Sequence, residues 1–248
     1  MGPLPDIVCA TWNVHRAVGS DRRPDGARVL DAIAADIAPE RPRVFALQEA
    51  DADDPPHAAL LDVARLEAAT GLVSVHDGPD MRWSAEGGGF LGNLLLLDPA
   101  IEILRRRIVD LPGAVPRAAV LAETMTDGVP LRLVSCHLSL VQALRAVQMR
   151  TLGQVIARAP AMQTILLGDL NEWRPWGGLA LGRRASGLAL AGPARRTFPS
   201  RAPMLPLDRI LTDRGGTVRG ARALRGAAVA AASDHLPLRA RVTRGDAA

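Results

Sequence analysis

Short apolar runs recur along the whole chain and alternate with helical patterns and turn residues. Apolar runs of this length are typical of buried strands, and their alternation with amphipathic helices is typical of α/β chains. We expect strands at residues 7–14, 44–49, 92–97, 101–109, 118–125, 131–138, 164–169, 207–212 and 236–243. We expect helices at 24–37, 57–70 and 140–158, the last with Leu144, Val147, Thr151, Val155 and Ile156 near one face. The consecutive strands between 92 and 138 favour antiparallel pairing over a purely parallel sheet.

A chain of 248 residues can form one large domain or two small ones. No repeat or low-complexity linker divides it, and 48% of its residues are hydrophobic, so a single domain over residues 1–248 is expected. No uncharged apolar stretch is long enough to span a bilayer. Residues 1–6 lack the basic region and apolar core of a signal peptide. The sequence therefore predicts a cytoplasmic monomer without stable membrane insertion.

Every one of the 30 basic side chains is an arginine, and the formal charge is +4. Arginine forks match phosphate oxygens, which favours phosphate-bearing partners. The codon usage of a GC-rich genome is the favoured explanation for most of these arginines, so basicity alone does not indicate nucleic-acid binding. Cys9 and Cys136 lie inside apolar runs, where two buried free thiols are favoured over a disulfide.

Four of the expected strands run directly into a polar residue that can take part in chemistry. These residues are Asn13, Glu49, His137 and Asp169. Strand ends that meet at one edge of a sheet are where α/β proteins build their sites, so we expect the four side chains to lie together. His15 follows Asn13 by two and is expected on the same strand face, where it lines the site or holds a carboxylate.

The carboxylates Glu49, Asp169, Asp208 and Asp234 each follow or interrupt an apolar segment. Carboxylates are costly in such places unless they are paired or hold a cation. Mg²⁺ prefers one or two carboxylates together with waters and phosphate oxygens, and this set can provide them. Asn171 emerges beyond the same strand as Asp169 and is a candidate to hold a phosphate oxygen or an attacking water.

Residues Ser233, Asp234 and His235 are consecutive. Adjacent side chains diverge, so the three do not form a nucleophilic triad among themselves. In an extended segment Asp234 and His235 point to opposite sides and serve different partners. His235 is a candidate general base if another carboxylate orients it, and Asp208 is the candidate for that role.

Two loops are candidates for substrate contact. The glycine-rich segment 87–92 formally matches G-x-G-x-x-G, but a strand is expected after it where a dinucleotide site needs a helix. We expect a mobile loop there that lines a substrate groove. Trp173 and Trp176 lie in the loop-rich region 172–206. Three interpretations are open for them: stacking on a base, contact with a lipid surface, or closing the core beside the site. The core interpretation is at least as well supported as the other two.

The motifs, in their order along the chain, resemble those of the endonuclease/exonuclease/phosphatase superfamily. They are T-W-N-V-H-R at 11–16, A-L-Q-E at 46–49, G-N-L-L-L-L at 92–97, S-C-H-L-S at 135–139, G-D-L-N at 168–171, L-D-R-I at 207–210 and S-D-H at 233–235. S-D-H alone is a weak signal, but seven motifs in order cover almost the whole chain. The resemblance implies an α/β (α+β) fold, a four-layer sandwich of two mixed β-sheets packed face to face and flanked by helices.

The same resemblance implies metal-dependent hydrolysis of a phosphoester bond by in-line attack of water. It implies that Glu49 is the principal ligand of Mg²⁺, with Mn²⁺ able to substitute. It implies that Asn13 and Asp234 assist Glu49. It also implies that Asp169 and Asn171 position the water and the phosphate.

Further roles follow from the resemblance. Asp208 would orient His235, and His137 would contact the scissile phosphate. Arg117 and Asn93 would bind the substrate. Either His235 or Asp169 is the base, and the sequence does not separate the two.

Some positions depart from the pattern of particular members. Abasic-site endonucleases carry an acidic residue where this chain has His15, and an active-site tyrosine where this chain has none. Both departures count against abasic-site repair. Arg145 and Gln148 resemble an R-x-x-Q pattern that we interpret as structural. The candidate substrates are nucleic acid, a phospholipid head group or a small phosphorylated molecule, and the alternative is an inactive scaffold.

Overall fold

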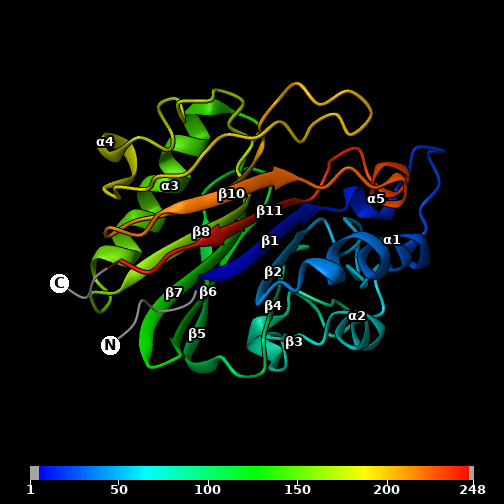
Figure 1. Cartoon of the computed structure of the whole chain (residues 1–248), viewed down its shortest axis with the longest axis horizontal. Helices are drawn as coiled ribbons and strands as arrows, with labels where there is room; N and C mark the ends of the chain where they lie inside the picture. The colour runs from blue at the N-terminus through cyan, green and yellow to red at the C-terminus, as the bar shows by residue number, and fades with distance from the viewer. Residues whose placement is uncertain (1–5, 246–248) are drawn as a thin grey trace.

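The computed structural model describes residues 6–245, so residues 1–5, on which the expectation about a signal peptide depends, lie outside it. Two mixed sheets dominate the fold (Figure 1). The six-stranded sheet has the order β10-β11-β1-β2-β4-β3, with strands Val218–Ala223, Leu238–Val242, Ile7–Asn13, Val44–Gln48, Leu94–Leu97 and Val73–Ser74. The five-stranded sheet has the order β5-β6-β7-β8-β9, with strands Glu102–Leu111, Arg117–Thr126, Val129–His137, Gln163–Asp169 and Asp208–Thr212.

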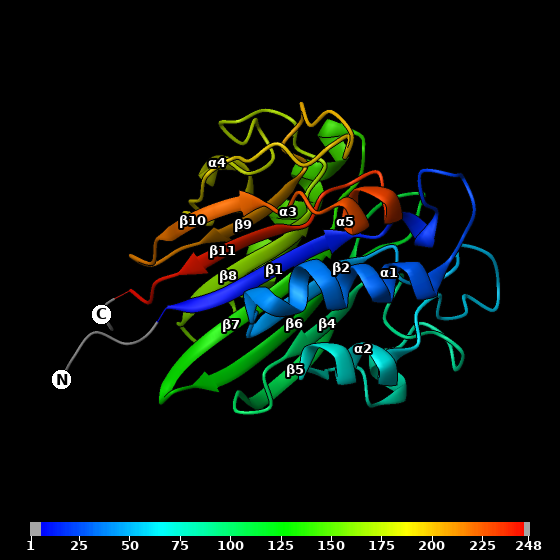
Figure 2. The same cartoon turned by 45° about the vertical axis from the view of Figure 1, so that its right-hand side comes forward.

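Helices cover the outer face of each sheet, as the two views of the chain show (Figures 1 and 2). Over the six-stranded sheet lie α1 (Gly26–Ala32), which continues into a π-helical turn at Ile33–Ile37, α2 (Val63–Thr70) and α5 (Ala227–Ala232). Over the five-stranded sheet lies α3 (Gln142–Ala157), which packs beside α4 (Arg183–Ser186). The expected four-layer sandwich is therefore confirmed.

Alternation along the strands produces the layers. In β1, Ile7 and Cys9 pack between the two sheets, whereas Ala10 and Trp12 pack under the helices of the six-stranded sheet. A strand that is buried on both faces reads as a continuous apolar run, which is why its limits are visible in the sequence. Cys9 is a free buried thiol, as expected, and burial raises its pKa to about 12.

Strand register carries the polar strand ends to one edge. β1 and β2 are parallel and pair Asn13 with Gln48, the residue before Glu49. β7 and β8 are also parallel and pair His137 with Asp169. The antiparallel neighbour β9 begins with Asp208 opposite Asp169.

Some expected elements were wrong in position or pairing. The strand expected at 92–97 belongs to the six-stranded sheet, pairing antiparallel with β2 and β3, and not to the consecutive antiparallel run β5-β6-β7. The helix expected from 57 begins at Val63, because Asp62 caps it by accepting the Arg65 N–H at 3.1 Å. The helix expected from 24 begins at Gly26 after an equivalent cap by Asp25. Strands β3 and β10 and helices α4 and α5 were not expected.

The buried face of α3 also differs from the expected one. Its inner side carries two polar residues, Arg145 and Gln148, followed by Met149, Leu152 and Ile156. Val147, expected on the apolar face, is exposed. The buried face of α3 is therefore shifted by about one residue from the predicted face, because polar residues occupy part of it.

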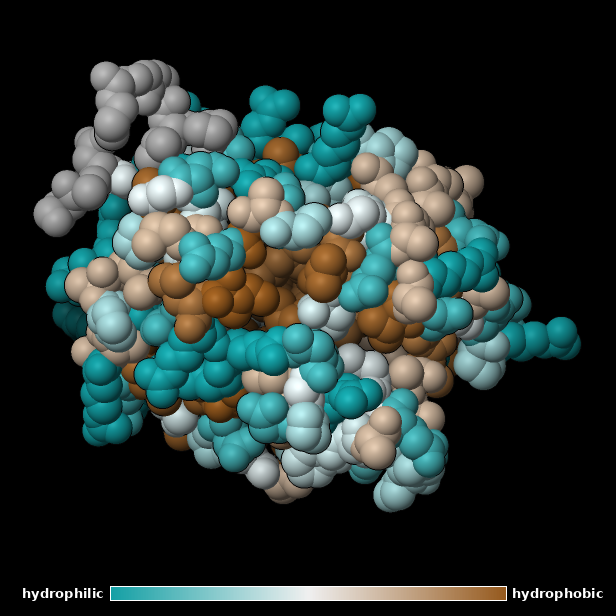
Figure 3. All heavy atoms as spheres, turned by 90° about the horizontal axis from the view of Figure 1, so that it is seen from below, coloured by the Kyte–Doolittle hydropathy of each residue, from teal (hydrophilic) through white to brown (hydrophobic). Residues whose placement is uncertain are grey.

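None of the helices in the described residues is long and apolar enough to cross a membrane. The open edge strands β5 and β3 lie on the face of the molecule seen in Figure 3, where hydrophobic side chains gather in a hollow bordered by hydrophilic ones. Arg105, Arg106 and Arg107 follow one another in β5 and place charge on this edge. Charged side chains on an edge strand oppose pairing with another chain.

Candidate active site

The polar strand ends of both sheets meet at one edge of the sandwich. The Asn13 amide nitrogen donates to Glu49 Oε1 at 3.1 Å and to Asp169 Oδ2 at 2.9 Å, so it links the two sheets. The Asn13 oxygen accepts the backbone N–H of His15. The His137 Nε2 atom lies 3.5 Å from Asp169 Oδ2 and 4.0 Å from Glu49 Oε1. The four side chains expected to lie together do so.

His235 and Asp208 form an oriented pair. The His235 Nδ1 atom lies 2.9 Å from Asp208 Oδ2, and its Nε2 atom lies 3.9 Å from Asp169 Oδ2. Burial alone would lower the pKa of His235, but the charge of Asp208, its hydrogen bond and the charges of Asp169 and Asp234 raise it to about 10. The imidazole therefore carries its proton at neutral pH when these carboxylates are the charges around it.

His137 is held in one tautomer. The Arg117 Nη1 atom donates to His137 Nδ1 at 2.9 Å, and because guanidinium cannot accept, Nδ1 is the acceptor and Nε2 carries the hydrogen. Burial, only partly opposed by Asp169, lowers the pKa of His137 to about 3. A neutral His137 thus presents one N–H toward Glu49 and Asp169.

Asp169 and Asn171 form the turn beyond β8. The Asn171 backbone N–H donates to Asp169 Oδ1, and its side-chain nitrogen donates to the Leu138 carbonyl, both at 2.9 Å. Asn171 adopts a left-handed backbone with φ of 51°. One of the two N–H groups of its amide is used within the protein, so the other N–H and the oxygen remain for a ligand.

The S-D-H segment sends its side chains to different partners, as expected. The Ser233 hydroxyl donates to the Asn13 carbonyl at 2.7 Å and accepts the His235 N–H at 3.0 Å. Asp234 Oδ1 lies 3.5 Å from His15 Nδ1. Ser233 therefore fastens this segment to β1. The His15 Nδ1 atom contacts the Val18 carbonyl at 3.1 Å and lies near Asp234 without a hydrogen bond to it. The strand-face argument for His15 was wrong, since β1 ends at Asn13 and His15 adopts a positive φ.

Three carboxylate oxygens at the site are buried and have no hydrogen-bond donor. Within the described residues they are Glu49 Oε2, Asp208 Oδ1 and Asp234 Oδ1. The Arg16 Nη1 atom lies 3.3 Å from Glu49 Oε2 and partly balances its charge. Such oxygens are what Mg²⁺ prefers, so Glu49 and Asp234 fit a divalent cation.

Asp169, Asp208 and His235 also come within reach of one another, with one potential ligand atom of each inside 4.8 Å. Hydrogen bonds already account for much of this cluster, because Asp208 Oδ2 accepts both His235 Nδ1 and, at 2.5 Å, the Thr197 hydroxyl. The second oxygen of Asp208, Oδ1, has no donor, so this cluster can also contribute a ligand to a cation.

The predicted substrate-binding residues differ in their surroundings. Arg117 lies beside His137 and lines a pocket that begins at Glu49. Asn93 is buried, and its amide nitrogen donates to the carbonyls of Phe90 and Ala118. Asn93 thus ties the start of β4 to the residue after Arg117.

The structural interpretation of Arg145 and Gln148 is confirmed. Arg145 donates to the carbonyls of Ser139 and Leu140, and Gln148 accepts the Ser139 N–H. Both side chains are buried and hold the loop that follows β7.

The interpretation of Trp173 and Trp176 as core residues was wrong, since their exposed fractions are 47% and 76%. The Arg174 guanidinium lies over the Trp173 ring at 4.2 Å. These tryptophans therefore belong to the surface of the loop beyond β8.

Left-handed backbone conformations concentrate around the site. Besides Asn171, positive φ angles between 48° and 58° occur at His15, Arg16, Ala17 and Glu49. Such conformations cost on the order of 1 kcal/mol or more for residues with a Cβ, and they persist where the surroundings enforce them. Here they turn Arg16 and Glu49 toward each other.

Sequence reasoning missed two residues that act on this site. Thr197, which donates to Asp208, begins the run T-F-P-S at residues 197–200, and the adjacent Phe198 ring packs on His235 with centroids 4.9 Å apart. Arg16 stands within the first motif and pairs with Glu49 and with Asp53. The sequence signal for both residues was that each lies in or near a motif. The spacing of residues along the chain does not reveal which side chains they contact.

Comparison with known proteins agrees with this fold. Over 162 residues the chain is 31% identical to the uncharacterized protein YbhP of Escherichia coli (strain K12), a match that spans 62% of this chain and 63% of the relative, less than two thirds of its length. The fold is similar to Danio rerio TDP2 complexed with single-strand DNA product (TM-score 0.69, 18% identity, 96% of this chain and 99% of the other). It is also similar to the mannosyl-6-phosphatase of Bacteroides thetaiotaomicron VPI-5482 (TM-score 0.68, 14% identity, 96% and 99%).

The model of one family matches residues 10–235, a span that contains every site residue described above. The chain belongs to the Endonuclease/Exonuclease/phosphatase family.

Proposed function

We propose that this chain hydrolyses phosphoester bonds, and phosphodiester bonds in particular, with Mg²⁺ or Mn²⁺ as cofactor. The observation that carries the proposal is the meeting of Glu49, Asp169 and Asp234 with two differently protonated histidines at one edge of the sandwich. Such a set can bind a cation, activate water and supply a proton within one site.

In this proposal Glu49 and Asp234 hold the cation through the oxygens that lack a donor, and Asn13 assists. Asn13 offers its amide nitrogen to the site in this structure, so its own ligation requires the amide to turn over. When bound, the cation neutralises charge on the phosphoryl oxygens.

Proton transfer falls to Asp169 and His235. The raised pKa of His235 favours Asp169 as the acceptor of the water proton and His235 as the donor to the leaving oxygen. The Asn171 oxygen can accept from the attacking water. His137 Nε2–H, fixed by Arg117, is a donor for a phosphoryl oxygen.

The proposal leaves three candidate classes of substrate. Relatives of this fold include a protein bound to single-strand DNA product and a sugar phosphatase. Nucleic acid, a phospholipid head group and a small phosphorylated molecule therefore all stay candidates. Cytoplasmic location, a monomeric state and one domain over 1–248 also stay predictions.

The test is hydrolysis of bis-p-nitrophenyl phosphate with Mg²⁺, with Mn²⁺ and with a chelator, followed by plasmid DNA, RNA, phosphatidyl lipids and sugar phosphates. Glu49→Ala and His235→Ala should each lower kcat by about 100-fold or more. Glu102→Ala, an exposed change on β5, is the matched control. An inactive scaffold would show neither turnover nor cation binding, and that result would overturn the proposal.

A further inference from the structure

We propose that three loops beside the active site form a docking surface for an anionic lipid bilayer, to which the protein binds reversibly and without inserting a helix. We call this surface the apolar rim and define it by six exposed hydrophobic side chains: Val115, Leu140, Val141, Trp173, Trp176 and Leu179. The inference goes beyond the proposed hydrolysis and holds whichever phosphoester is cleaved, because it concerns the surface on which the protein binds.

The side chains of the apolar rim protrude from the protein. The exposed fractions are 78% for Leu140, 76% for Trp176 and 65% for Val115. Trp176 lies at the tip of a turn, in which the Gly177 N–H donates to the Arg174 carbonyl at 2.9 Å. Single exposed hydrophobic side chains are ordinary, but six on adjoining loops indicate a contact surface.

Two buried side chains of α3 hold the three loops against one another. Arg145 donates to the Leu140 carbonyl at 2.7 Å and lies 3.4 Å from Glu172 Oε2, so it joins two of the loops. Gln148 donates to the Pro112 carbonyl at 3.0 Å and so adds the third. The apolar rim is therefore presented by loops that the core holds in place.

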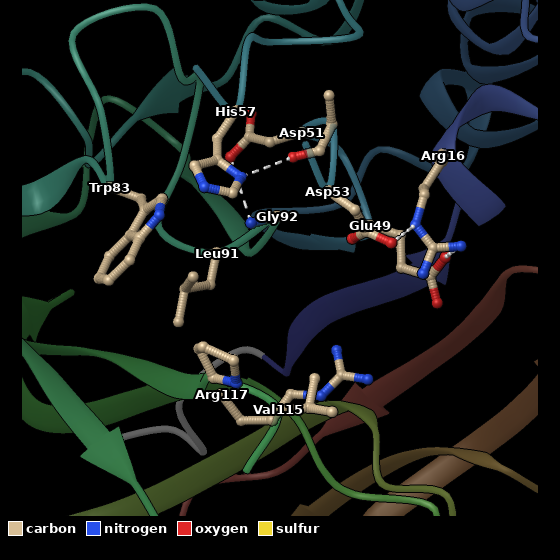
Figure 4. Close-up of a pocket in the computed structure, with 12 residues that line it drawn as sticks. Arg16, Glu49, Asp51, Asp53, His57, Trp83, Leu91, Gly92, Val115 and Arg117 are labelled. Carbon is tan, nitrogen blue, oxygen red and sulfur yellow. Dashed lines mark hydrogen bonds and ion pairs between the residues drawn. The ribbon is translucent and has the colours of Figure 1, made fainter. Parts of the chain in front are cut away.

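The apolar rim borders the active site. Val115 lies beside Arg117 on one side of the pocket that extends from Glu49 (Figure 4). The other two loops begin just beyond His137 and Asn171. A bilayer in contact with the apolar rim would therefore lie next to the opening of the site.

The part of the chain that carries most of the apolar rim is strongly basic. Residues 128–207 contain ten arginines but only two acidic residues, Asp169 and Glu172, and both of these are buried. This stretch has a surplus of eight positive charges, whereas the whole chain has a surplus of four. Its helices α3 and α4 lie on one flank of the sandwich (Figures 1 and 2), where Arg183 and Arg184 are exposed and have no ion-pair partner within the described residues.

An anionic bilayer suits both the apolar rim and the basic flank. Tryptophan and aliphatic side chains enter the membrane interface, and nearby arginines are attracted to anionic head groups. A nucleic acid would suit the arginines, but four of the six rim side chains are aliphatic and offer no ring on which a base can stack. A second copy of this chain would bring a surface of the same charge.

Cosedimentation of wild type with vesicles, in the absence of divalent cations, tests the inference. Vesicles of phosphatidylcholine with about 30% phosphatidylglycerol should bind about tenfold more tightly than phosphatidylcholine alone, and high salt should remove most of this difference. Trp176→Ala and Leu140→Ser should each weaken binding about fivefold. Leu104→Ser, the matched change of an exposed leucine on β5, should leave binding unchanged.

A second pair of variants tests the charge. Arg183→Gln combined with Arg184→Gln should remove most of the preference for anionic vesicles. Arg219→Gln combined with Arg241→Gln removes the same charge from exposed positions on β10 and β11 and should keep the preference.

Several results would overturn the inference. They are equal or absent binding of wild type to the two kinds of vesicle, an unchanged affinity in both Trp176→Ala and Leu140→Ser, or a dimer of wild type that Leu140→Ser abolishes. Tighter binding of a single-stranded oligonucleotide than of vesicles, lost in Trp176→Ala, would also overturn it, in favour of nucleic acid. Failure of the proposed function would appear separately, as no turnover of bis-p-nitrophenyl phosphate by wild type.

Discussion

Several side chains at this site act mainly by fixing the tautomer, orientation or backbone position of another residue. Arg117 selects the tautomer of His137, Asp208 orients His235, and Ser233 fastens the His235 backbone. Mutation of residues that hydrogen-bond to metal ligands typically lowers metal affinity or activity ten- to a hundredfold, and we expect effects of similar size here. Thr197 extends the chain of contacts by one more hydrogen bond, to Asp208.

Replacing Thr197 with valine removes that hydrogen bond and keeps the shape of the side chain. We expect kcat to fall about tenfold with little change in KM, because Asp208 loses the donor that holds it. The limb of the kcat–pH profile that belongs to His235 should move to higher pH, since Asp208 then accepts from His235 alone. Steady-state kinetics across pH measure both effects.

Two further variants separate positioning from a general loss of structure. Thr197→Ser restores the hydroxyl and should restore most of kcat. Thr151→Val makes the same exchange on α3, where the hydroxyl donates to the Val147 carbonyl, and should leave kcat unchanged. An unaltered kcat and pH profile in Thr197→Val would contradict the positioning role.

At the scale of elements, the strands buried on both faces were predictable because Ile7–Asn13 and Gln163–Asp169 are continuous apolar runs. The polar residues at their ends were predictable candidates for the same reason. The inner face of α3 was not, because Arg145 and Gln148 are buried by bonds to a loop that the sequence pattern does not reveal. The alanine-rich α5 has no distinct apolar face, so packing against the sheet, not periodicity, makes it a helix.

The connection between β3 and β4 contains a buried histidine that should make stability depend on pH. The His76 Nδ1–H donates to the Met81 carbonyl at 2.6 Å, and its Nε2 accepts the Leu95 N–H at 3.1 Å. One donor and one acceptor describe a neutral imidazole. Burial lowers the pKa of His76 to about 4, from an ordinary value near 6.5.

His76 therefore binds a proton below about pH 6.5 in the unfolded chain, but only below about pH 4 in the folded chain. Stability is complete above pH 6.5 and falls as pH drops through this window, by on the order of 3 kcal/mol. Urea unfolding at pH 7 and pH 5 measures the loss. His76→Gln removes the titrating group and should flatten this part of the profile; an equally steep profile in the variant would contradict the assignment.

For the molecule as a whole, the site lies across the interface of the two sheets. Asn13 and Glu49 come from the six-stranded sheet, and His137 and Asp169 come from the five-stranded sheet. Several carboxylates are gathered there, and Arg16 and His235 supply part of the opposing charge. A divalent cation held by Glu49 and Asp234, which lie just after β2 and before β11 of the six-stranded sheet, would relieve part of this repulsion.

Binding to the folded state alone should raise the stability of the entire fold. A cation present at about 100 times its Kd contributes roughly 2.7 kcal/mol, which for a chain of this size corresponds to about 5–10 °C in Tm. We expect Mg²⁺ to raise the Tm of wild type by that amount, and a chelator to reverse the shift. Calorimetric scans of wild type and of Glu49→Gln, which keeps the shape of the side chain but loses its charge, make the comparison. A shift in Glu49→Gln as large as that in wild type would place the cation elsewhere, because binding through Glu49 requires its charged oxygen.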